Sequence, residues 1–309
     1  MTEIKTIACF ETGTMGSAIA AQFATAGFST NVFLHHPDQK EQIYQRITTI
    51  IKLLVDHGLS NGTYDQVVTN LHYCDNYEDT LTNADFVTES ISEDLALKQA
   101  TWQAIENVAD ETTIFSTNTS GLDPDEIASG LKHPERFVVA HFWNPAHLMP
   151  LVEVVPAPTT NDETVQATIE LMQAIGKHPV ALKKASLGFV GNRIQAAVLR
   201  ESLNIVEQGI ASPQAVDEIV KYSLGRRWNL VGPIASADFG GLDVFDNISK
   251  YLYADLDNQP GEDPRLKAKV DQHELGLKTG RGFYDWQGQT GQELIQARDQ
   301  GLIDEIKRD

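Results

Sequence analysis

Several features that would place a protein in a special class are missing from this sequence. There are only two cysteines, Cys9 and Cys74, and no C-x-x-C pair. Two isolated cysteines cannot build a disulfide framework, which indicates a reducing compartment. No apolar run approaches the roughly 20 residues that span a bilayer, and the N-terminus lacks the basic start and apolar core of a signal peptide. We therefore expect a cytoplasmic protein without a membrane partner.

Basic residues are also scarce. The chain has 24 lysines and arginines against 43 aspartates and glutamates, which gives a formal net charge of −19. Such a surface repels the phosphates of nucleic acids and of anionic lipids, so nucleic acid is not an expected partner. Internal repeats and low-complexity tracts are absent, and we assign no metal ligand. A small-molecule substrate fits this composition better.

The first residues present the strongest local pattern. Residues 4–16, IKTIACFETGTMG, read as a short apolar strand followed at once by Gly13, Thr14, Met15 and Gly16, and residues 17–27 continue with helical character. Strand, tight turn and helix in this order present a helix N-terminus to the pyrophosphate of a dinucleotide. The complete fingerprint is G-x-G-x-x-G, and its first position here is Glu11.

A second departure from the dinucleotide pattern lies about 20 residues further on. The end of the second strand should carry an acid that binds the ribose hydroxyls of NAD. Leu34 stands at this position, and His35 and His36 follow it. The two histidines either contact a 2′-phosphate or are ordinary surface loop residues. NAD is the expected cofactor, NADP is an open alternative, and we expect the binding of NAD to be weak.

The remaining chain divides into an alternating half and a helical half. Residues 38–75 predict a helical hairpin. Further strands are predicted at 85–90, 112–117, 137–141, 151–155 and 179–182, with helices at 93–108, 122–131 and 162–175 between them. After residue 185 only helical patterns follow, with a peripheral helix after residue 286. We predict a Rossmann-like, doubly wound, mostly parallel α/β sheet in residues 1–185, with the hairpin inserted at 38–75, and an all-α domain in residues 186–309.

Polar residues follow the strand ends, where open α/β sheets bind ligands. His141 follows the apolar run FVVA, and Glu153 lies twelve residues later between two valines. A carboxylate inside an apolar strand is costly unless it has a partner. A pair between these two side chains would fix the imidazole tautomer and make a general base. The alternative is a structural ion pair, or an edge-strand glutamate in solvent.

Taken together, the motifs resemble the L-3-hydroxyacyl-CoA dehydrogenase family over nearly the whole chain. The matching pieces are GTMGSAIA, ESISEDLALK, TNTS, RFVVAHFWNPAHLMPLVEVV, GFVGNR, GPIASADFGGLDVF and GLKTGRGFYDW. The resemblance implies a Rossmann-like domain followed by an all-helical domain for dimerisation and substrate binding, a homodimer formed through that domain, and a part in fatty acid metabolism.

The resemblance also assigns roles to individual residues. His141 would be the general base and Glu153 its orienting partner, while Ser120 and Asn192 would bind the substrate. Asn118 would lie near the nicotinamide and the substrate. Two further positions match cofactor contacts of the family, Glu93 and Lys98, and the turn at residues 13–16 would hold the pyrophosphate. The reaction implied is hydride transfer between C3 of a short-chain L-3-hydroxyacyl-CoA, such as 3-hydroxybutyryl-CoA, and the nicotinamide.

The hairpin bears on the substrate. In the family it contributes basic contacts to the CoA phosphates, a role that would fall here to Lys52. Residues 38–75 contain three basic and five acidic residues, so the segment is net acidic. Two alternatives therefore stay open: a dehydrogenase of a free 3-hydroxy acid of the gulonate or carnitine kind, and a binding protein with impaired cofactor binding.

Overall fold

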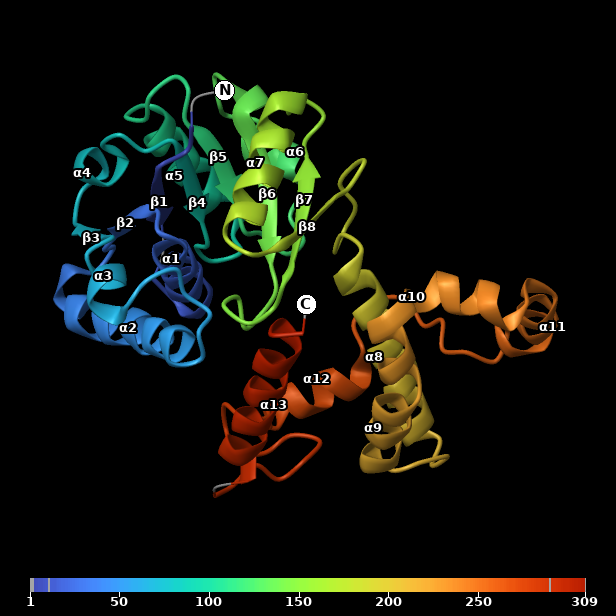
Figure 1. The fold of residues 1–309 in the computed structure, drawn as a ribbon. Helices are drawn as coiled ribbons and strands as arrows, with labels where there is room; N and C mark the ends of the chain where they lie inside the picture. The colour runs from blue at the N-terminus through green and yellow to red at the C-terminus, as the bar shows by residue number, and fades with distance from the viewer. Residues whose placement is uncertain (1–2, 11, 289, 309) are drawn as a thin grey trace. The chain divides into compact units, whose positions relative to one another are not determined.

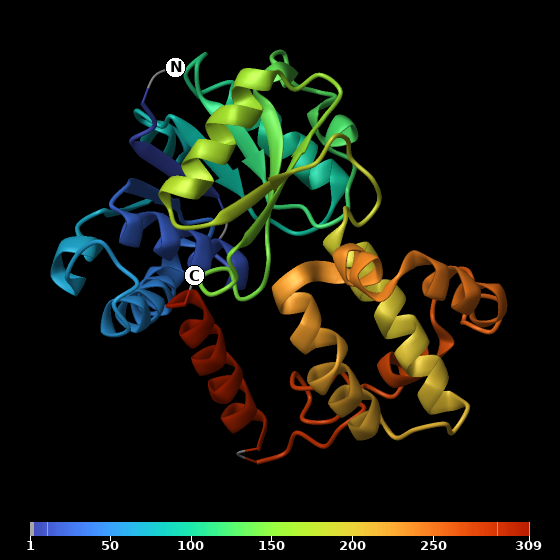
Figure 2. The same cartoon turned by 45° about the vertical axis from the view of Figure 1, so that its right-hand side comes forward.

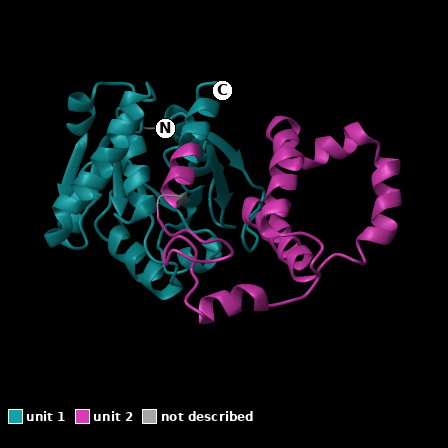
Figure 3. Ribbon diagram, turned by 90° about the horizontal axis from the view of Figure 1, so that it is seen from below, with its two compact units in different colours: residues 1–190, 298–309 teal, residues 191–297 magenta. Residues whose placement is uncertain are grey.

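The computed structural model describes residues 3–10, 12–288 and 290–308. Glu11, the unusual residue in the first turn, lies outside them. The described chain forms two compact units, residues 1–190 with 298–309 and residues 191–297 (Figure 3). The sequence analysis assigns residues 298–309 to the helical domain, whereas here they group with the first unit.

The first unit is built on an eight-stranded sheet within the described residues (Figure 1). Its strands lie in the order β3-β2-β1-β4-β5-β6-β7-β8. All neighbouring strands are parallel except β6 and β7, which are antiparallel. The strands are β1 (Thr6–Phe10), β2 (Ser29–Phe33), β3 (Leu71–Cys74), β4 (Phe86–Glu89), β5 (Ile114–Thr117), β6 (Phe137–Phe142), β7 (Leu151–Pro156) and β8 (His178–Ala181). The predicted mostly parallel α/β sheet is confirmed.

Helices cover both faces of this sheet, as the two-residue period of its strands requires. In β1, Ile7 and Cys9 belong to the core on one face, whereas Ala8 and Phe10 belong to the core on the other. The first core is closed by α1 (Thr14–Ala26), α2 (Lys40–Asp56) and α7 (Asp162–Ala174), and Figure 2 shows α7 lying across the sheet. The second core is closed by α4 (Tyr77–Leu81), α5 (Leu95–Glu106) and α6 (Pro124–Ala128).

The prediction of a purely helical hairpin at residues 38–75 is wrong at its end. Helix α2 and the short helix α3 (Tyr64–Val68) are present, but β3 (Leu71–Cys74) follows and pairs in parallel with β2 at the edge of the sheet. Four residues, of which only Leu71 is buried, are too short to show a strand period in the sequence.

The second unit is helical. Its helices are α8 (Gly191–Glu207), α9 (Pro213–Tyr222), α10 (Leu224–Gly240), α11 (Leu242–Leu252) and α12 (Pro264–Asp271). Helix α10 is kinked where Gly232, at φ 65°, precedes Pro233. Helix α13 (Thr290–Ile306) follows, and Ile303 near its end is buried in a small cluster with Leu54 and Leu148 of the first unit. The predicted terminal helix is therefore present and anchored by an apolar side chain.

One partly buried histidine, His147, makes the stability of the fold sensitive to acid. Burial, and secondarily the neighbouring Lys177, lower the pKa of His147 to about 4. In the unfolded chain the pKa returns to about 6.5, so between these values the unfolded state binds one more proton. The stability contribution is complete above pH 6.5 and is lost as the pH falls towards 4. We expect a loss of about 2 kcal/mol at pH 5 relative to pH 7, measured by chemical denaturation. In the variant His147→Phe the free energy of unfolding should fall less between pH 7 and pH 5 than in the wild type, by about the same 2 kcal/mol. An equal fall in both proteins would refute the role of His147.

Candidate active site

His141 and Glu153 face each other on adjacent strands. They are directly paired in the antiparallel register of β6 and β7. The Nδ1 atom of His141 lies 2.9 Å from Oε2 of Glu153, and both residues are buried, with 6% and 2% of their surface exposed. An ionised carboxylate accepts from an Nδ1–H group, which fixes the tautomer that leaves the Nε2 lone pair available. The pairing expected from the sequence is present.

The segment after β8 supports this pair. The backbone N–H of Val190 donates to Oε1 of Glu153 at 3.0 Å, so both oxygens of the carboxylate are engaged. The ring of Phe189 lies 5.6 Å from the imidazole, and that of Trp143 lies 5.7 Å from it. Phe189 adopts a left-handed φ of 47° and is 1% exposed. A bulky residue in this conformation is held by its surroundings. Phe189 and Val190 both belong to the motif GFVGNR, but no role could be assigned to them from the sequence.

A second network lies where β4 and β5 end. Glu89 is fully buried and accepts from the Lys98 ammonium at 2.6 Å, the Trp102 indole at 3.2 Å and the Thr117 hydroxyl at 2.8 Å. Its carboxylate also accepts from the backbone N–H of Ile91 at 2.7 Å. The sequence resemblance gives Lys98 a cofactor contact. In the structure Lys98 is fully buried and its charge neutralises Glu89.

The Lys98 ammonium reaches a second carboxylate, Glu93, at 3.6 Å. Glu93 accepts from the Thr119 hydroxyl at 2.6 Å and from the backbone N–H of Ser120 at 3.0 Å. Burial works to raise the pKa of the Glu93 carboxyl, but the Thr119 hydroxyl, the Lys98 charge and the backbone N–H groups together lower it. Glu93 is therefore ionised at neutral pH and holds the turn that carries Ser120.

Three other predicted site residues are placed as follows. The amide oxygen of Asn118 accepts from the backbone N–H of Phe142 at 2.8 Å, which ties the end of β5 to the strand of His141. Asn192 lies in the first turn of α8, in the helical unit. Lys52 is exposed on α2 and forms an ion pair with Asp56 at 3.2 Å.

A cavity of about 490 Å³ borders the N-terminus of α1. Gly13 is the N-cap of this helix and brings no side chain to it, and the cavity wall also includes Thr12, His35, His36 and Arg46. The Arg46 guanidinium donates to the Thr12 carbonyl at 2.6 Å, so it adds positive charge beside the helix N-terminus. These donors fit the pyrophosphate of a dinucleotide. The helix begins at Thr14, three residues before the predicted start at 17, so that Gly13 is its N-cap and residues 14–16 form its first turn. Arg46 is a contributor that could not be assigned from the sequence.

Leu34 does not border this cavity. Its side chain is 3% exposed and packs in the core of the sheet. The position that the pattern gives to a ribose-binding acid is thus an apolar core position here, and the exposed His35 and His36 line the cavity beside it.

The described residues contain no group of three or more histidines, cysteines and acids that could hold a metal ion. Among the helices of the described chain, none is long and apolar enough to cross a membrane.

With this geometry established, comparison with known proteins defines the class. Residues 6–185 match the NAD binding domain of 3-hydroxyacyl-CoA dehydrogenase, and residues 188–286 match its C-terminal domain. The protein belongs to the 3-hydroxyacyl-CoA dehydrogenase family. It is accordingly an NAD-dependent oxidoreductase.

Two relatives span almost the whole chain. The 5-formyl-3-hydroxy-2-methylpyridine 4-carboxylate 5-dehydrogenase of Mesorhizobium japonicum is 30% identical, over 97% of this chain and 96% of its own. A probable 3-hydroxybutyryl-CoA dehydrogenase of Bacillus subtilis is 33% identical, over 93% of this chain and 99% of its own.

Solved structures show the same two kinds of relative. A crystal structure of the pyridine carboxylate dehydrogenase, described as an NAD⁺-dependent dismutase, has a TM-score of 0.90 at 30% identity and covers 98% of this chain and 97% of its own. The (S)-3-hydroxybutyryl-CoA dehydrogenase of Ralstonia eutropha has a TM-score of 0.75 at 28% identity and covers 93% and 100%.

Proposed function

We propose that the protein transfers a hydride between C3 of a short-chain L-3-hydroxyacyl-CoA and NAD, with His141 as the general base. The observation that carries this proposal is the buried pair of His141 and Glu153, which leaves Nε2 as a proton acceptor. Bound NAD supplies the hydride acceptor. The cavity beside Gly13 would hold its pyrophosphate, and Glu93 and Asn118 lie on the turns that would flank its nicotinamide.

The protein's own part in the reaction is proton transfer and positioning. During oxidation Nε2 of His141 takes the proton of the substrate hydroxyl, and Glu153 stabilises the imidazolium that results. During reduction the imidazolium returns this proton to the oxygen at C3. Ser120, held by Glu93, and Asn192 would bind polar groups of the substrate. A well-placed donor to an oxygen that gains charge contributes about 3 kcal/mol to the transition state.

A free hydroxy acid is the second candidate substrate, and a specific observation favours it. Residues 38–75 are net acidic, and Lys52, the residue expected to meet a CoA phosphate, is already paired with Asp56. The pyridine carboxylate dehydrogenase, whose named substrate carries a free carboxylate, has the higher of the two TM-scores given above. For such a substrate His141 and Glu153 would act in the same way.

A steady-state assay separates the two candidates. The protein is mixed with NADH and either acetoacetyl-CoA or acetoacetate, and the loss of NADH is recorded. We expect turnover with acetoacetyl-CoA and much slower turnover with acetoacetate. The reverse order would transfer the proposal to the free acid. Turnover with neither compound, in a protein that binds NADH, would contradict both.

We also propose that the protein is a homodimer formed through the helical unit. In the described part of this unit the only buried apolar side chains are Leu203 and Val216. On α10, Leu230 is 81%, Ile234 82% and Phe239 77% exposed. An apolar surface of this extent on a soluble protein marks an interface, and a second copy of the chain is the partner it fits.

The double variant Leu230→Asp/Ile234→Asp is therefore expected to be monomeric. Each Leu or Ile buried in an interface contributes about 1.5–3 kcal/mol, and a symmetric dimer contains each twice, so Kd should rise by several orders of magnitude. Light scattering after size exclusion measures the change. Gln166→Asp, an exposed position on α7 of the first unit, is the control and should remain dimeric. A wild-type monomer would refute the proposal.

A further inference from the structure

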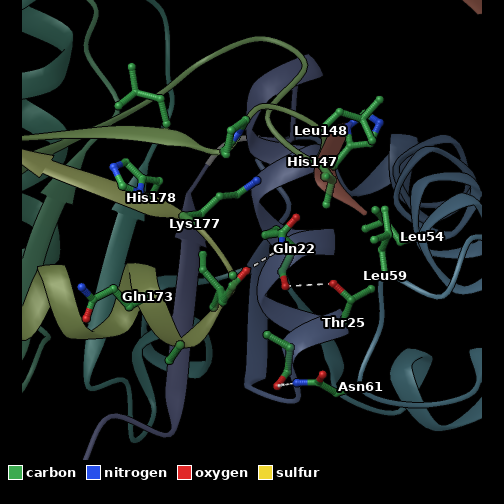
Figure 4. Close-up of a pocket in the computed structure, with 17 residues that line it drawn as sticks. Gln22, Thr25, Leu54, Leu59, Asn61, His147, Leu148, Gln173, Lys177 and His178 are labelled. Carbon is green, nitrogen blue, oxygen red and sulfur yellow. Dashed lines mark hydrogen bonds between the residues drawn. The ribbon is translucent and has the colours of Figure 1, made fainter. Parts of the chain in front are cut away.

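The first unit contains a second cavity, of about 840 Å³, that shares no lining residue with the cavity beside Gly13 (Figure 4). It lies between α1, the ends of α2 and α7, the start of β8 and the connection from β6 to β7. Although the chain has 43 acidic residues, none of the described residues that line this cavity is an aspartate or a glutamate. The cavity is therefore suited to a ligand with negative charge.

The positive charge in the cavity wall belongs to Lys177. This residue is 8% exposed, and its Nζ donates to the backbone carbonyls of Ala146 at 2.7 Å and Met149 at 3.0 Å. An ammonium group has three protons, so one donor is left beyond these two carbonyls. Figure 4 shows the end of this side chain directed into the cavity beside Gln22. Burial lowers the pKa of Lys177 to about 7, and an anion beside the ammonium would offset that cost.

Two side chains that line the same cavity each carry a buried polar atom with no hydrogen-bond partner among the described residues. These atoms are Oε1 of Gln22 and Nδ1 of His147. The orientation of the Gln22 amide is set by its Nε2, which donates to the Ile175 carbonyl at 2.8 Å, so Oε1 is the free acceptor. Buried polar atoms without partners are rare and call for a ligand or a water. A hydroxyl group of a ligand could donate a hydrogen bond to Oε1 of Gln22.

The remaining wall is mixed, with polar side chains from Thr25, Asn61, Gln173 and His178 and an apolar part. Leu54 and Leu59 line the side of the cavity opposite Lys177 (Figure 4), and Ile306 is a further apolar residue of the lining. The described lining residues offer one cation and include no arginine and no helix N-terminus, which suits a carboxylate better than a phosphate dianion. The apolar residues can contact a short carbon chain.

We propose that this cavity is a second ligand site, for a small hydroxycarboxylate whose carboxylate binds Lys177 and whose hydroxyl donates to Oε1 of Gln22. The site is separate from His141 and Glu153, neither of which lines it. Its existence does not depend on the proposed dehydrogenase reaction. The carbonyls that Lys177 holds belong to the connection between the strands of His141 and Glu153, so the ligand would lie against that connection.

Three probes of similar size test the site on the full-length protein without NAD. Glycolate carries both groups, acetate lacks the hydroxyl, and ethylene glycol lacks the charge. Ligand-observed NMR measures their binding. We expect glycolate to bind about fivefold more tightly than acetate, as one hydrogen bond allows, and ethylene glycol not to bind. Absence of glycolate binding would overturn the proposal.

Variants locate the bound probe. Lys177→Met should weaken glycolate and acetate alike by at least about tenfold, as the loss of a charge-assisted bond predicts. Because Lys177→Met also releases two carbonyls and could unfold, Ala174→Trp is the second variant. Ala174 is exposed at the cavity wall, and its replacement blocks the cavity with Lys177 in place. Gln22→Leu should abolish only the advantage of glycolate over acetate.

His141→Ala distinguishes the two sites, because it should bind glycolate as the wild type does. Weakened binding in His141→Ala would place the probe at the catalytic pair and overturn the proposal. Unchanged binding in both Lys177→Met and Ala174→Trp would do the same. The two proposals can therefore fail separately. A protein that binds glycolate but shows no dehydrogenase activity would contradict only the proposed reaction, and an active enzyme that does not bind glycolate would contradict only the second site.

Discussion

Replacing His141 by alanine is expected to lower kcat by about a thousandfold, since a positioned general base contributes about 10²–10⁴. Nδ1 of the imidazole lies 2.9 Å from Oε2 of Glu153, and His141 is only 6% exposed. Bulk water therefore cannot readily replace the imidazole as a base. In the proposed reaction the other nitrogen is the proton acceptor. Steady-state turnover of acetoacetyl-CoA with NADH measures the loss, and circular dichroism verifies that the variant is folded.

A matched control is available in the same unit. His133 has 54% of its side chain exposed and pairs with Glu135 on the surface at 3.1 Å. His133→Ala removes the same atoms from a histidine with an acidic partner, but away from the proposed site, and kcat should not change. A large loss in His133→Ala, or a His141→Ala protein as fast as the wild type, would remove His141 from its role.

The second large effect concerns stability. Lys98→Met is expected to lower the free energy of unfolding by about 3–5 kcal/mol, because it leaves a buried carboxylate without its counter-charge. Lys98 and Glu89 are both fully buried, with 2.6 Å between Nζ and Oε1. The hydrogen bonds from Trp102 and Thr117 to Glu89 remain, but they carry no net charge. Chemical denaturation at neutral pH measures the difference.

The double variant Lys98→Met/Glu89→Gln is the control for this mechanism. It removes both charges, so it should recover part of the lost stability. The recovery is incomplete because the new amide NH2 group meets the N–H donor of either Ile91 or Trp102. If the double variant is as unstable as Lys98→Met, the loss comes from packing at α5, and the account of an uncompensated charge is wrong.

Much of the fold follows from the sequence because its strands are apolar runs separated by helical periods. Residues 137–142, FVVAHF, are buried throughout, and no other element type suits so short an apolar run between turns. Strand β3 could not be found in this way, because only Leu71 of its four residues is buried. The docking of α13 could not be predicted either. It depends on Ile303, with Leu302 and Ile306 beside it, and on the contact of this cluster with Leu54, far away in the chain.

The candidate site was predictable where the chemistry requires an unusual residue. Glu153 inside an apolar strand needs a partner, and His141 is the histidine at the neighbouring strand end. The residues that hold this pair were not predictable, since Val190 acts through its backbone N–H and Phe189 through its ring, and neither residue type signals such a role. Lys98 illustrates the converse. A lysine is assumed to be exposed until a buried partner such as Glu89 is seen.

The proposed reaction depends on His141 and Glu153 acting as one catalytic unit. The most direct test is a double-mutant cycle on kcat with His141→Ala, Glu153→Gln and the double variant, with acetoacetyl-CoA and NADH. Because Glu153 would act only through the imidazole, the double variant should be no slower than His141→Ala alone. If the two single losses multiply in the double variant, the residues act independently, and the central claim is contradicted.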